Sequence, residues 1–75
     1  MIRIRREAFI NKIRDLRYRY KTQQKRTYLY RQAGTTNYIA VPMADFLEDE
    51  YVQYALRQAG CSEEDIRSFI SSAKS

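Results

Sequence analysis

The chain has 75 residues, a formal net charge of +5, one cysteine and no histidine. At this length we expect a single domain, residues 1–75, with a thin core, because a small domain buries only about 60% of the surface that its unfolded chain exposes. One thiol cannot form an internal disulfide, and a zinc site lacks ligands without histidine, so we expect no metal, no other cofactor and a reducing, cytoplasmic setting.

The positive charge is concentrated in the first 32 residues, which hold eleven Lys or Arg against two acids. Residues 33–75 hold three Lys or Arg against seven acids. Such a division is typical of a protein that binds a polyanion, because each cation placed on a phosphate releases counterions and adds affinity. A surface that only maintains solubility would intersperse the two signs, so we favour nucleic acid as the partner.

An amphipathic helix is predicted from about residue 5 to residue 17, where Phe9, Ile10, Ile13 and Leu16 share one stripe. The basic N-terminus before it lacks the apolar run of about 7–15 residues that a signal peptide needs. No stretch approaches the roughly 18 apolar residues of a membrane-spanning helix either. We therefore expect no membrane partner, and a helix lying on an anionic membrane is a weaker alternative.

Three strands are predicted next, at residues 18–23, 27–32 and 38–42. The first two alternate with a period of two, which places Tyr18 and Tyr20 on one face and Arg19 and Lys21 on the other. The third strand ends at the only proline, which cannot donate to a sheet. Short connections between them predict a three-stranded antiparallel meander. Five of the seven tyrosines lie in these strands, so sheet packing explains most of the tyrosines better than base stacking does.

Two helices close the chain. The first is predicted over residues 46–59, with acids in its first turn and Gly60 at its end. Ser62 caps the second, at residues 63–74, in a capping box with Asp65. The expected fold class is α+β, in the order α-β-β-β-α-α, with the helices on one face of the sheet.

The same order carries a resemblance to a known family. The pieces are FINKIRDLRYRYKTQQK, YLYR, YIAVP and ALRQAGCSEEDI, which together extend from Phe9 to Ile70. They resemble the HicA-type small toxins, which have the double-stranded-RNA-binding-domain-like fold. The resemblance implies RNA binding, metal-independent cleavage of messenger RNA, and neutralisation by a HicB-type antitoxin.

The catalytic histidine of that family is missing. Aligning YLYR with the family's second strand places Lys25, Arg26 and Thr27 where the family has Gly-Ser-His. Cleavage of an RNA backbone needs a base that accepts the 2′-hydroxyl proton, and threonine cannot serve. Cys61 lacks an activating histidine, and the clustered carboxylates are explained by helix capping. We therefore expect no nuclease activity and name no catalytic residue.

The sequence thus predicts an RNA-binding, HicA-like protein of a toxin–antitoxin system. The expected partners are RNA and a HicB-like antitoxin protein, with no small-molecule substrate. Two alternatives stay open: a protein-interaction module whose basic face binds an acidic antitoxin-like partner, and an mRNA interferase with a base other than histidine. The residues expected to bind RNA are Arg14, Arg17, Arg19, Lys21, Lys25, Arg26 and Arg31.

Overall fold

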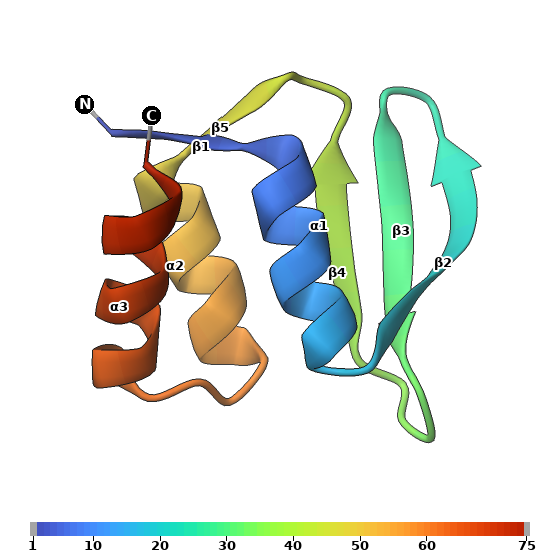
Figure 1. The fold of residues 1–75 in the computed structure, drawn as a ribbon. Helices are drawn as coiled ribbons and strands as arrows, with labels where there is room; N and C mark the ends of the chain where they lie inside the picture. The colour runs from blue at the N-terminus through green and yellow to red at the C-terminus, as the bar shows by residue number, and fades with distance from the viewer. Residues whose placement is uncertain (1, 75) are drawn as a thin grey trace.

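The computed structural model describes residues 2–74, which form two small sheets and three helices (Figure 1). This arrangement confirms the α+β class and the three-stranded antiparallel sheet, and it adds two short strands to the predicted order. The elements are β1 (Arg3–Arg5), α1 (Arg6–Asp15), β2 (Tyr18–Gln24), β3 (Thr27–Gln32), β4 (Tyr38–Pro42), β5 (Phe46–Glu48), α2 (Asp49–Gln58) and α3 (Glu63–Ala73).

The larger sheet has the strand order β2-β3-β4, with antiparallel pairing throughout. Alternation along the strands gives it two different faces. The face toward the helices holds mainly apolar and tyrosine side chains, and the opposite face, called here the open face, holds side chains that are exposed or half-buried. Paired across the open face are, among others, Arg19 with Arg31, and Arg31 with Tyr38.

A β-bulge interrupts this alternation in β2. Tyr20 pairs with Tyr30, but Thr22 pairs with Leu29, so Lys21 is an extra residue with no partner in the register. A bulge shifts every later side chain of its strand to the other face. The predicted strict alternation therefore fails after Tyr20: Thr22 lies opposite Leu29, on the face of Arg19, where alternation would place it on the face of Tyr20.

The smaller sheet corrects the predicted start of α2. Phe46–Glu48, expected as helix, form β5 and pair antiparallel with β1. Leu47 is buried opposite Ile4, while its two neighbours are exposed, which is the alternation of a strand. The pairing of Leu47 with Ile4 buries both side chains, and helix α2 then begins at Asp49.

The core lies between the helices and the helix-facing side of the sheet. It is built from apolar side chains that recur at helical spacing in α1, α2 and α3 and at alternate positions in β4. The predicted caps are present: Gly60 has a φ of +93°, and the Asp65 amide donates to the Ser62 hydroxyl at 3.1 Å. Within residues 2–74, no helix combines the length and apolar character needed to cross a membrane.

Burial on the helix-facing side falls steeply from β4 to β2. Along one row of paired residues, Ile39 is 5% exposed, Tyr30 is 6% exposed and Tyr20 is 54% exposed. In Figure 1 the three helices lie on the β4 side of the sheet and β2 is farthest from them. The helices therefore cover β4, β3 and the start of β2, where Tyr18 is buried, and leave β2 exposed from Tyr20 onward.

Candidate nucleic-acid interface

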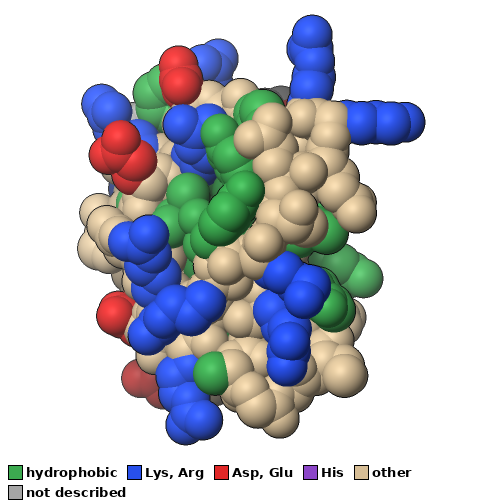
Figure 2. Space-filling view, turned by 90° about the vertical axis from the view of Figure 1, so that its right-hand side faces the viewer, with side chains coloured by type: hydrophobic (Ala, Val, Ile, Leu, Met, Phe, Trp, Pro, Cys, Tyr) green, Lys and Arg blue, Asp and Glu red, His purple; other side chains and the backbone are tan. Residues whose placement is uncertain are grey.

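The predicted RNA-binding cations all have exposed side chains and come from neighbouring elements. They lie at the C-terminal end of α1, on β2, at the turn after β2, and on β3. Figure 2 looks onto the side that is on the right in Figure 1, where β2 lies. Basic side chains spread over this side around a central apolar strip, and the acidic side chains in view lie along one margin.

Five of the seven cations belong to one end of the strands, and we call this group the β2 basic edge. It consists of Arg14, Arg17, Arg19, Lys21 and Arg31. Its centre is the cross-strand pair of Arg19 and Arg31. Like charges directly opposite each other destabilise a sheet, so this pair is more readily explained by a ligand than by folding.

Backbone carbonyls hold the two paired guanidinium groups in place. Arg19 donates to the carbonyl oxygens of Arg14, at 3.1 Å, and Tyr18, at 3.0 Å. Arg31 donates through Nε to the carbonyl oxygen of Thr35 at 2.9 Å. The carbonyl of Arg14 lies in the last turn of α1, where cations are favoured by the helix dipole. Carbonyls fix the two cations without neutralising their charge.

Arg17 adopts a backbone conformation that is unusual for its side chain. It follows the end of α1 with a φ of +74°, in the left-handed region that usually holds glycine at this position. Its amide donates to the Arg14 carbonyl and its carbonyl accepts from the Ala33 amide, both at 2.9 Å. An arginine here costs stability, so its presence favours a role for the charged side chain.

Lys25 and Arg26 form a second, separate group. They occupy the two-residue turn between β2 and β3, and Lys25 has a φ of +53°. Lys25 lies six positions along the chain from Arg19, which corresponds to about 20 Å at the rise of a strand. The seven predicted cations are therefore not one cluster, although a single extended polyanion can reach both groups.

None of the seven cations takes part in an ion pair among residues 2–74. The two ion pairs there join Lys12 with Asp65, at 3.2 Å, and Arg57 with Glu63, at 2.6 Å. Both involve α3, whose acids neutralise cations outside the predicted set. The charge of the β2 basic edge is thus available to a partner.

A shallow hollow of about 370 Å³ lies at this edge. This volume is at the low end of the roughly 300–1,000 Å³ of small-ligand sites. Its lining residues are Arg19, Tyr20, Lys21, Arg31, Gln32 and Ala33.

Two residues of this region were not among the predicted site residues. Tyr20 lines the hollow and is half exposed, and its ring centroid lies 6.1 Å from that of Tyr28 and 6.0 Å from that of Tyr30. The Arg6 guanidinium lies 5.9 Å from the Tyr28 ring. The basic residues at the start of the chain indicate already in the sequence that Arg6 could bind a polyanion. Only the position of the helices reveals that Tyr20 is uncovered.

Thr27, which the resemblance to the HicA-type toxins aligns with their histidine, has no acid–base capacity near neutral pH. Thr27 begins β3, pairs with Gln24 and Pro42, and is half-buried. Elsewhere, burial and then the charge of Asp65 raise the pKa of the Cys61 thiol. The thiol is thus protonated at neutral pH, which opposes a nucleophilic role.

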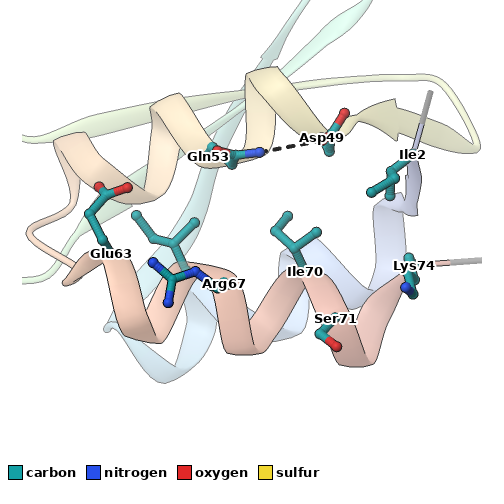
Figure 3. A pocket seen from close by; sticks show the side chains of 9 residues that line it. Ile2, Asp49, Gln53, Glu63, Arg67, Ile70, Ser71 and Lys74 are labelled. Carbon is teal, nitrogen blue, oxygen red and sulfur yellow. Dashed lines mark hydrogen bonds between the residues drawn. The ribbon is translucent and has the colours of Figure 1, made fainter.

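A second hollow, of about 270 Å³, lies between α2, α3 and the start of β1 (Figure 3). Ile66 and Ile70 contribute apolar walls, and the charged residues around it have both signs. Two of its acids are occupied: Asp49 accepts from Gln53 at 3.3 Å, and Glu63 is bound by Arg57. Mixed charge makes this hollow a poorer site for a polyanion than the β2 basic edge.

Comparisons with protein-family models, with curated proteins and with solved structures found no match to this chain.

Proposed function

We propose that this chain is a HicA-like protein of a toxin–antitoxin system that binds RNA and does not cleave it. The observation that carries the proposal is the β2 basic edge, where five exposed cations gather outside any ion pair among residues 2–74. Arg19 opposite Arg31 is a costly arrangement for a sheet alone. Phosphate groups would offset this repulsion, and arginine suits them because its planar fork binds two oxygens at once.

We also propose that the fold is of the double-stranded-RNA-binding-domain-like kind. In support, α1, the β2-β3-β4 meander and α2 follow one another in the order that the resemblance implies. The β1–β5 ribbon and α3 are additions to that order. The helices pack against one face and leave the other for a ligand.

A salt titration tests RNA binding. Full engagement of the five cations with a single strand gives a slope of about −3.5 for log affinity against log salt, at roughly −0.7 per phosphate contact. Suitable probes are oligouridine of about 16 nucleotides and an RNA duplex of about 16 base pairs. Absence of binding to both at low salt, or a slope near zero, contradicts the proposal.

The loss of nuclease activity has its own test. Because general acid–base catalysis contributes about 10²–10⁴-fold, the unmodified protein should cleave RNA at the background rate and cause no growth arrest when expressed. A Thr27→His variant tests whether the rest of a HicA-like site is intact. Weak RNA cleavage by this variant near neutral pH would show that the rest of the site is intact. Robust cleavage by the unmodified protein, free of contaminating nuclease, contradicts this part of the proposal.

The protein partner that we propose is a HicB-like antitoxin. An acidic protein would be attracted by the same β2 basic edge as RNA, and in that case the two compete. Displacement of oligouridine by polyglutamate measures the charge component of this competition. Saturable binding to polyglutamate with no binding to either RNA probe would instead identify the chain as a pure protein-interaction module.

A further inference from the structure

We infer that the β2 basic edge holds an unpaired nucleotide, with its base stacked on Tyr20 and its phosphates among Arg19, Lys21 and Arg31. The inference rests on the proposed RNA binding and makes it more specific, because it names single-stranded RNA as the ligand. It departs from the sequence-based expectation that sheet packing explains most of the strand tyrosines.

Tyr20 is not used as a core residue. It is 54% exposed, whereas Tyr18 on the same strand is 1% exposed and Tyr30 beside it is 6% exposed. A half-exposed ring next to buried ones arises because the helices cover β4, β3 and the start of β2 at Tyr18 but leave Tyr20 uncovered. An exposed aromatic surface of this kind is what unpaired bases stack upon.

The ring of Tyr20 is nonetheless held in place. It packs edgewise with Tyr28 at an interplanar angle of 68° and with Tyr30 at 74°. Two such contacts restrict the side chain before any ligand arrives, which lowers the entropy cost of stacking. The tyrosine is therefore both accessible and preorganised.

Tyr20 shares its hollow with three of the cations, Arg19, Lys21 and Arg31. β2 is an edge strand, so side chains from both of its faces border the hollow at the edge of the sheet. Lys21, the extra residue of the bulge, also lines this hollow, and bulges commonly redirect a side chain in this way. An aromatic ring among cations matches a nucleotide, which combines a flat apolar base with a charged phosphate.

Two features distinguish this site from other uses of the surface. In duplex RNA the base faces are already stacked on each other, so Tyr20 cannot reach them and duplex gains only the phosphate contacts. A protein strand that added to β2 would meet the bulge and the cations, both of which oppose strand pairing at an edge. Single-stranded RNA is the ligand that uses the ring and the charges together.

Binding of oligouridine and of duplex RNA to the full chain tests the inference. We expect Tyr20→Ala to weaken oligouridine binding by about 5- to 150-fold, the equivalent of one stacked base. The salt slope and the duplex affinity should not change. Tyr54→Ala is the matched control, because Tyr54 is 61% exposed on α2, outside the β2 basic edge, and Tyr20→Phe should bind like the unmodified protein.

The ring protons of Tyr20 give a measurement that needs no variant. Stacking of uracil should move their NMR resonances upfield in the unmodified protein when oligouridine is added. Unmoved Tyr20 resonances with oligouridine bound, or tighter binding of duplex than of oligouridine, overturn the inference and leave the proposed RNA binding intact. Failure of both probes to bind overturns the proposed function itself.

Discussion

Arg17 offers a test in which stability and binding change in opposite directions. Its φ of +74° places an arginine where the backbone favours glycine. Replacing Arg17 with glycine removes this strain and removes one cation of the β2 basic edge. We therefore expect Arg17→Gly to unfold at a higher temperature than the unmodified protein and to bind RNA more weakly.

The magnitude follows from two opposing terms. A left-handed conformation costs a non-glycine residue about 1–2 kcal/mol. Glycine also increases the conformational entropy of the unfolded chain, which destabilises the fold by about 0.4–1 kcal/mol. The net gain is thus at most about 1.5 kcal/mol, and each kcal/mol raises the Tm of so small a domain by about 4–8 °C.

Thermal denaturation followed by circular dichroism, together with an oligouridine titration, makes both measurements. Arg17→Ala is the matched control, because alanine removes the charge and keeps the strain. Both variants should reduce the salt slope by about 0.7, the value of one contact with a single strand. An Arg17→Gly variant that melts below Arg17→Ala would refute the strain argument, and unchanged binding by both would remove Arg17 from the interface.

Three further outcomes follow from particular side chains. Lys21→Glu should weaken RNA binding strongly. Arg67→Glu, which reverses an exposed charge on α3, should weaken it little. Equal effects of the two variants would indicate that only the net charge of the protein matters. Glu63 accepts a hydrogen bond from Arg57, which lowers the pKa of Glu63 below its ordinary value of 4.5. The pair therefore stabilises the fold fully above pH 4.5. This stabilisation is lost as the pH falls through the lowered pKa. The Tm difference between Glu63→Gln and the unmodified protein should accordingly shrink in acid, and a constant difference would show that the pair does not titrate in the fold. Phe9→Ala empties a fully buried position at a cost of about 3–5 kcal/mol, about the whole stability of a domain this small, so its far-ultraviolet spectrum should be that of an unfolded chain.

Local signals in the sequence predicted the larger sheet and the helix ends well. Alternation in β3 correctly separated Tyr28 and Tyr30 from Leu29 and Arg31, because each strand residue points to the face opposite its neighbours. Gly60 and Ser62 correctly marked the end of α2 and the start of α3, since their roles depend only on the adjacent turn.

The misplaced features depend on residues far apart in the chain. Phe46–Glu48 form a strand only because Arg3–Arg5 lie beside them, and the acids that follow resemble a helix start on their own. The bulge at Lys21 depends on how β2 pairs with β3, which strict alternation does not reveal.

The candidate site was predictable in charge but not in shape. The excess of cations in the first third of the chain indicated the right elements. The sheet register decides that Arg19 lies opposite Arg31. The position of the helices decides that Tyr20 is uncovered while Tyr30 is buried. These tertiary relations turn a basic sequence into a site with both charge and an aromatic ring.

The location of bound RNA is the most direct test of the central claim. Backbone amide resonances recorded during an oligouridine titration should shift at the C-terminal end of α1, along β2 and on β3 around Arg31. Resonances of α2 and α3, including those beside the hollow in Figure 3, should stay in place. Shifts that gather at α2 and α3, or that fail to appear at low salt, would contradict the assignment of RNA binding to the β2 basic edge.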